Sequence, residues 1–199
     1  MFDPHLGYGI ATALLILFAF FGAFDGVYFH MLKFKLHQHP PAQFEHLIHT
    51  FRGVLFIPIA LIFFVWNSAG IMLWIGLWLL VIDLIAEVVD ILVEKKSRAE
   101  LGGISPTESV IHVTATGFRM AALSIVIAMK PLHAFSVFTS TSELTLLPTY
   151  LTITGSFFIC GVGIALLLQI FMSCIDIPLQ QKNRLFQSQT RLCCLFRTQ

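Results

Sequence analysis

Five long apolar runs alternate with short polar segments along the chain. They predict helices over residues 8–32, 44–66, 71–93, 106–129 and 147–175. Each run is close to the roughly 20 residues that a helix needs to cross the hydrocarbon core of a bilayer. A turn at 67–70 separates the second and third runs, and Ser105 followed by Pro106 marks the start of the fourth helix. The pattern predicts an all-α, polytopic integral membrane protein with about five transmembrane helices.

The composition agrees with this class and excludes others. The chain has 199 residues, of which 57% are hydrophobic and 12% charged, whereas soluble domains carry about 25% charged residues. The mean hydropathy is +0.84, and a net charge of +1 supplies no field that would attract a nucleic acid. We expect one transmembrane domain over residues 1–179, followed by a basic cytoplasmic tail over 180–199.

The basic residues predict an orientation. If the amino terminus faces outward, ten of the twelve Lys and Arg residues lie at or near the cytoplasmic side. The exceptions are Arg119, inside the fourth apolar run, and Lys130 at its outer end. Cytoplasmic loops of membrane proteins carry such an excess of Lys and Arg. We therefore expect the amino terminus outside and the carboxyl terminus in the cytoplasm, in a bacterial inner membrane.

Ionisable residues gather near the predicted cytoplasmic ends of the first four helices. Asp83, Glu87 and Asp90 stand at i, i+4 and i+7, which places them on one stripe of a helix. Two other helices repeat the pattern Glu-x-x-x-His with an Arg further along the same face. They carry Glu45, His49 and Arg52, and Glu108, His112 and Arg119, respectively. We expect these faces to meet in a four-helix polar core.

Charged side chains inside a membrane need partners that offset the free-energy cost of burying them. A charged side chain near the bilayer centre costs on the order of 2.5–3.5 kcal/mol. The six carboxylates of the core are those of Asp25, Glu45, Asp83, Glu87, Asp90 and Glu108. Against the two guanidiniums of Arg52 and Arg119 they leave four excess negative charges. Protonation or divalent cations can meet this excess, and two divalent ions would neutralise it. A mixed set of carboxylates and imidazoles suits iron, zinc or manganese, and we favour iron.

The predicted metal ligands are the histidines and acids of this core. They are His30, His46, His49, Asp83, Glu87, Asp90 and His112, followed by Glu45 and Glu108. We expect Asp25, Arg52 and Arg119 to hold those ligands in position.

Simpler roles stay open for some of these residues. Glu108 completes a capping box begun by Ser105, and Glu45 complements the dipole at the start of its helix. The acidic stripe itself could serve only to balance the two arginines. Residues 94–103 are expected to form a charged loop outside the core.

Two motifs carry a resemblance to a known family. Asp25–His30 reads Asp-Gly-x-x-x-His, and Glu45–Arg52 reads Glu-His-x-x-His-x-x-Arg. Together with the later acidic and Glu-x-x-x-His segments, they resemble a family of small bacterial polytopic membrane proteins over residues 20–120. The resemblance implies a multi-helix membrane fold and supplies no activity. A looser similarity links the chain to ferritin-like di-metal bundles, which use Glu-x-x-His at i, i+3 rather than the i, i+4 spacing found here.

These observations predict a membrane metalloenzyme with a mono- or dinuclear site near the cytoplasmic interface. A site at that depth is reached from the lipid, so we expect an amphiphilic substrate such as a lipid or a quinone. Oxidation or hydroxylation is favoured over hydrolysis by a metal-bound water. The alternatives are a proton or divalent-cation transporter, or a non-catalytic subunit of a membrane complex. Membrane lipid is an expected partner, nucleic acid is not, and homo-oligomerisation is left open.

Overall fold

The computed structural model describes residues 3–39, 42–99, 102–144 and 146–195, and in these ranges the regular structure is entirely helical. The side chains of 37, 143 and 173–195 are not among those described. The long elements are α1 (Pro4–Ala23) with the π-helix η1 (Phe24–Lys33), α2 (Gln43–Ala60) with the π-helix η4 (Leu61–Val65), α3 (Gly70–Ser97), α4 (Pro106–Ala128) and α5 (Thr149–Leu195). The short 3₁₀ turns are η2 (Leu36–Gln38), η6 (Leu132–Phe135) and η7 (Thr141–Glu143).

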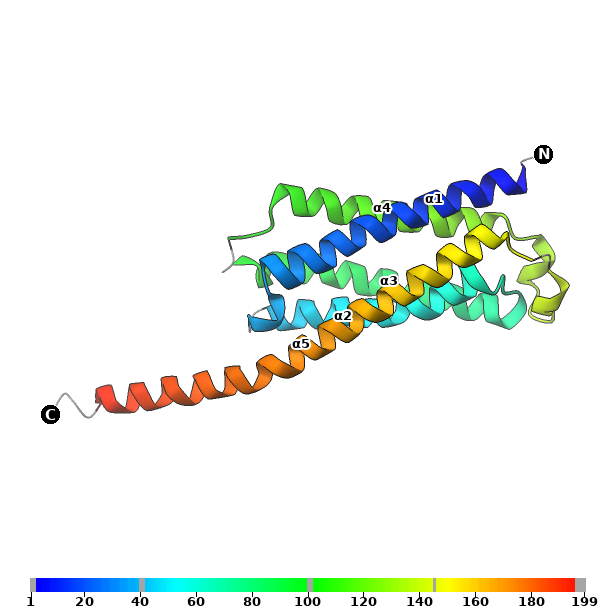
Figure 1. The fold of residues 1–199 in the computed structure, drawn as a ribbon. Coiled ribbons are helices and arrows are strands. Elements are labelled where there is room, and N and C mark those ends of the chain that lie inside the picture. The colour runs from blue at the N-terminus through cyan, green and yellow to red at the C-terminus, as the bar shows by residue number, and fades with distance from the viewer. Residues whose placement is uncertain (1–2, 40–41, 100–101, 145, 196–199) are drawn as a thin grey trace.

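The sequence pattern is confirmed at the level of the fold. The described residues form five helices that are long and apolar enough to cross a membrane. These segments cover Pro4–Lys33, Gln43–Val65, Gly70–Ser97, Pro106–Ala128 and Thr149–Met172. The boundary after the third segment is wrong, because α3 continues through Ser97 where a loop was expected from residue 94. The backbone of α5 stays helical into the basic tail and extends beyond the bundle (Figure 1).

The helix starts follow ordinary capping chemistry. Asp3 caps α1 by accepting a hydrogen bond from the backbone N–H of His5 at 2.9 Å, with Pro4 in the first turn. Ser105 caps α4 in the same way, since its hydroxyl accepts from the N–H of Glu108 at 3.2 Å. Of the two hydrogen bonds in the expected capping box, the one from the backbone N–H of Glu108 to the hydroxyl of Ser105 is therefore present.

Four of the long helices form two neighbouring pairs, and α5 packs against one helix of each pair. α1 lies beside α4 and α2 lies beside α3, while α5 packs against α1, α2 and η4 (Figure 1). One end of the bundle holds the turn between η4 and α3 and the connection from α4 to α5. The opposite end holds the connections from η1 to α2 and from α3 to α4. The predicted polar core lies at this second end.

The first end is packed with apolar side chains. Phe63, Phe64 and Leu73 are completely buried there. A Cβ added to Gly76 of α3 would lie 2.6 Å from Cγ2 of Ile62, and one added to Gly155 of α5 would lie 2.9 Å from Cβ of Phe64. Both helices therefore approach η4 more closely than a side chain would allow, as small residues permit in membrane bundles.

Candidate metal centre and its ion-pair frame

The π-helix η1 brings Asp25 and His30 onto one side of their helix. Hydrogen bonds in a π-helix join residues five apart, so these two residues stand one turn from each other. In an α-helix they would point about 140° apart. Here Oδ1 of Asp25 lies 3.8 Å from Nε2 of His30, and both residues are buried. The wider helix thus presents an acid and an imidazole to the interior together.

Two arginines balance most of the acidic stripe on α3. The guanidinium of Arg52 lies 3.4 Å from Asp83, 3.5 Å from Glu87 and 3.1 Å from Asp90. Arg119 donates to Asp83 and to Glu87 from the other side. Asp83 and Glu87 each face both arginines, so the structure places these two predicted ligands in a ladder of ion pairs. These ion pairs are the simpler role that the sequence left open, and Glu87 also accepts a hydrogen bond from the hydroxyl of Thr116.

A third buried cation, Arg98, was missed by sequence reasoning. Its guanidinium is completely buried, with Nη2 at 2.8 Å from Oε1 of Glu45 and 2.9 Å from Oε1 of Glu108. Burial alone would lower the pKa of Arg98, but the hydrogen bonds and charges of Glu45 and Glu108 outweigh it and raise the pKa above its usual value. The hydroxyl of Ser97 also donates to Glu45. Glu45 and Glu108, both predicted metal ligands, are therefore ion-paired with Arg98.

The helical spacing of the acidic stripe on α3 could have indicated that Arg98 faces the interior. Counting on from Asp90 by seven or eight residues reaches Ser97 and Arg98, so the polar face of α3 continues through its last turn. With Arg98 included, the six buried carboxylates face three guanidiniums rather than two. The excess is three negative charges, and the earlier count of four is corrected.

A group of three histidines remains beside this frame. His30, His49 and His112 come from η1, α2 and α4, and the ring centroids of His30 and His49 are 4.1 Å apart. Those of His49 and His112 are 6.2 Å apart. Two imidazoles that share a metal at about 2.0–2.1 Å from each nitrogen have centroids separated by up to about 6.5 Å. The three rings are close enough to face one ion.

Carboxylates orient two of these rings. Nδ1 of His112 lies 2.9 Å from Oδ2 of Asp25, and Nε2 of His49 lies 3.3 Å from Oδ2 of Asp90. A nitrogen that faces a carboxylate carries the proton, which leaves the other nitrogen of a neutral ring with a free lone pair. Metal-binding histidines are held by carboxylates in this way. Asp25 thus faces His112, as expected of a residue that holds a ligand in position, and Asp90, a predicted ligand, faces His49.

His30 is the least satisfied member of the group. Both of its ring nitrogens are buried and have no hydrogen-bond partner among the described residues, and the same holds for Nε2 of His112. One ligand atom each from His30, Glu45 and His49 lie within 4.8 Å of one another. His46 is outside that trio. Buried polar groups are seldom left without partners, so this arrangement points to a ligand that the protein itself does not supply.

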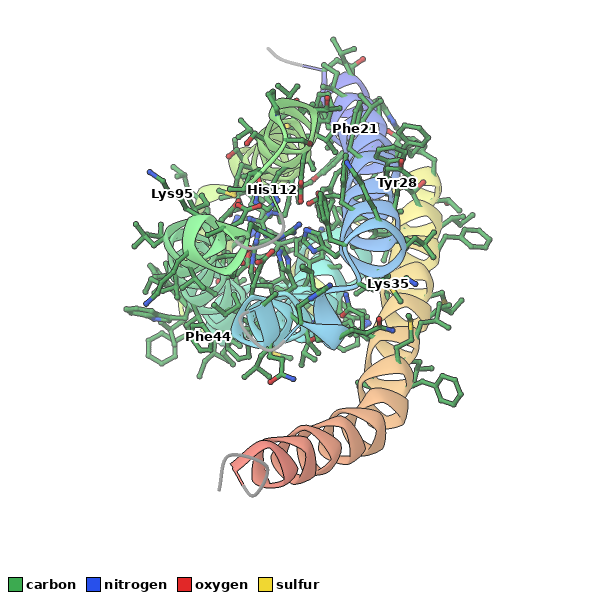
Figure 2. The ribbon with its side chains drawn as sticks, turned by 90° about the vertical axis from the view of Figure 1, so that its left-hand side faces the viewer. Phe21, Tyr28, Lys35, Phe44, Lys95 and His112 are labelled. Atoms are coloured by element: carbon green, nitrogen blue, oxygen red, sulfur yellow. The ribbon has the colours of Figure 1, made fainter. Side chains whose placement is uncertain are left out.

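A cavity of about 560 Å³ opens beside the histidines. It is lined by α1 and η1, α2, α4 and α5, with the three histidines, Asp25, Arg52 and Arg119 at its polar end. Figure 2 shows nitrogen and oxygen atoms gathered between the helices around His112, whereas Lys95 points outward. The rest of the lining is largely apolar. The site therefore combines a polar pocket with an apolar approach.

A scan against protein-family models, a search of curated proteins and a search of solved structures each return no match. What the structure defines is a class, namely a five-helix apolar bundle with a buried ion-pair frame and a histidine group. Function has to be inferred from that site, because a helical bundle does not imply a chemistry.

Proposed function

We propose that this protein is a membrane metalloenzyme that holds a single divalent transition-metal ion between His30, His49 and Glu45, with His112 beside them. The observation that carries the proposal is His30, a buried imidazole in ring contact with His49 whose nitrogens have no hydrogen-bond partner in the described part of the chain. A neutral imidazole has one N–H donor and one lone pair, and leaving both without partners at this depth is costly. A metal bound at one ring nitrogen satisfies the lone pair.

The charges support one ion rather than two. Arg52 and Arg119 pair with Asp83, Glu87 and Asp90, and Asp25 faces His30 and His112. These four carboxylates and two guanidiniums leave two negative charges when the histidines are neutral. One divalent cation neutralises this group. The remaining negative charge belongs to the ion-paired group of Arg98, Glu45 and Glu108, which adjoins the proposed ion through Glu45.

The ligand set favours iron. Two histidines and one carboxylate with open positions are typical of non-haem iron oxygenases, although zinc accepts the same donors. In an oxygenase reaction, one atom of dioxygen enters a C–H bond of the substrate and the other leaves as water. Two electrons and two protons come from an external reductant such as a quinol. We propose an amphiphilic substrate, because the apolar part of the cavity adjoins this site.

We also propose that the site lies near the cytoplasmic face. Lys33, Lys35, Lys95 and Lys96 are at the same end of the bundle as the histidines, and this is the end that the positive-inside rule assigns to the cytoplasm. Transport fits less well, because the opposite end is filled by the apolar core around Phe63 and Phe64.

Metal content tests the proposal. The full chain, purified without a histidine tag, is loaded with Fe(II) under anaerobic conditions, desalted and analysed for metal. We expect about one ion per chain in the wild type and in His133→Ala, whose histidine is exposed in η6 at the opposite end. His30→Ala and His49→Ala should retain only a small fraction, because each removes a ligand from an all-protein set. Equal metal in His49→Ala and His133→Ala would contradict the site.

A further inference from the structure

The cavity is elongated along α1 and α5. Its lining on α5 runs from Thr154 to Gln169, which corresponds to about 22 Å at 1.5 Å per residue. On the neighbouring helix it runs from Leu15 of α1 to Met31 of η1. One leaflet of a bilayer has about 15 Å of hydrocarbon, half of the full core. The cavity is therefore a groove long enough for one lipid chain.

Small residues keep the middle of the groove open. Ala19, Gly22 and Ala23 line it from α1, and Gly161 and Ala165 line it from α5. A Cβ built on Gly161 meets no atom within 4 Å. No side chain of these residues reaches across the space between the two helices. The rings of Phe18 on α1 and Phe158 on α5 are in contact, with centroids 5.3 Å apart, and the small residues leave room for a chain of methylene groups on the polar side of that contact.

The volume fits one chain rather than two. A water-sized group occupies about 30 Å³, and a methylene group is of similar size. The cavity of about 560 Å³ therefore holds roughly 19 such groups. That is the size of a single long acyl chain with its head group.

The polar end of the groove selects the head group. Nε of Arg119 is buried and has no acceptor among the described residues, although both of its terminal nitrogens are in ion pairs. Arg119 and His30 both line the cavity. A carboxylate offers two acceptor oxygens, one for this N–H donor and one for a metal held by the histidines. An alcohol offers a single oxygen.

We propose that the groove binds one long-chain fatty acid, with its carboxylate toward Arg119 and the histidine group and its chain between α1 and α5. The placement of the carboxylate rests on the proposed metal site, whereas the placement of the acyl chain rests on the groove alone. The lipid enters sideways from the bilayer, because the groove is lined by the outermost helix, α5, which packs on the bundle through α1, α2 and η4.

Photo-crosslinking tests the inference on the full-length protein in nanodiscs. The probe is palmitic acid that carries a diazirine in its chain and an alkyne tag. Gly161→Phe puts a ring into the groove and should reduce labelling about tenfold or more. Gly163→Phe is the matched control. It lies on the same helix, a Cβ there also meets no atom within 4 Å, and it does not line the cavity. Its labelling should stay within about twofold of wild type.

Competition and metal content separate the two proposals. Unlabelled palmitic acid should displace the probe about tenfold more effectively than hexadecanol, and labelled peptides should map to α1 and α5. Equal labelling of the two glycine variants, or equal competition by acid and alcohol, would overturn the inference. Ala165→Leu provides a second, smaller obstruction should Gly161→Phe not fold. Metal is measured on the same samples. Metal without labelling refutes the fatty-acid site alone, and labelling without metal refutes the metalloenzyme alone.

Discussion

Replacing Arg98 with methionine tests how strongly one guanidinium ties three helices together. Arg98 follows the last residue of α3, Glu45 lies in the first turn of α2 and Glu108 lies in the first turn of α4. The exposed fraction of the side chain is 0% for Arg98, 0% for Glu45 and 1% for Glu108. Methionine keeps much of the volume and removes the charge. Two buried carboxylates would then face each other without a cation.

The expected loss follows from this burial. Removing one partner of a buried ion pair costs about 3–5 kcal/mol, because the remaining charge stays desolvated. This corresponds to a loss of roughly two to four orders of magnitude in the ratio of folded to unfolded protein. Replacing the whole group by apolar residues of similar volume is often neutral. The triple variant with methionine at Arg98, Glu45 and Glu108 should therefore recover most of the stability.

The assay is reversible unfolding in mixed detergent micelles, followed by tryptophan fluorescence or circular dichroism. Lys96→Met is the control, since Lys96 is exposed one turn or less from the same helix end, and it should change the free energy of unfolding by no more than about 0.5 kcal/mol. The reasoning is refuted if Arg98→Met costs less than about 1 kcal/mol, or if the triple variant is no more stable than Arg98→Met.

Three further outcomes follow from the same structure. Asp83→Asn removes a negative charge that faces Arg52 and Arg119, so it should lower the free energy of unfolding by about 3 kcal/mol. The metal content should stay at the wild-type level, and metal analysis and a melting curve on one sample check both results. Gly76→Leu should cost about 1–3 kcal/mol by overpacking η4, whereas Gly117→Leu, where a Cβ meets nothing within 4 Å, should be close to neutral in the same unfolding assay. Burial lowers the pKa of Lys130 from the usual 10.5 to about 8. Between these two pH values the unfolded chain binds more protons than the folded chain, so the free energy of unfolding should rise from pH 8 to pH 10.5. Lys130→Met should abolish that rise.

Local periodicity was enough to predict the five helices and the acidic stripe. The apolar runs are long, and Asp83, Glu87 and Asp90 recur at helical spacing whatever the rest of the fold does. The same spacing correctly placed Glu45 with His49 on one face of α2. These features depend only on neighbours along one helix.

The partners of these residues depend on packing between helices, which spacing does not contain. Arg98 follows Lys95 and Lys96 in a charged stretch that reads as a loop, yet the last turn of α3 carries it into the interior. The π-helical turn that aligns Asp25 with His30 has no cue in the apolar pattern around it. The groove requires α1 and α5 to lie side by side, and the fifth apolar run gave no sign of that.

The central claim is a metal held by imidazoles, and X-ray absorption at the metal edge of the iron-loaded wild type tests it most directly. We predict a shell of nitrogen and oxygen neighbours at about 2.0–2.2 Å, outer-shell scattering from at least two imidazole rings, and no sulfur neighbour. His49→Ala should lose iron together with part of the imidazole scattering. A spectrum with sulfur ligands, or with oxygen neighbours alone and no imidazole scattering, would contradict the proposed centre at His30, His49 and Glu45.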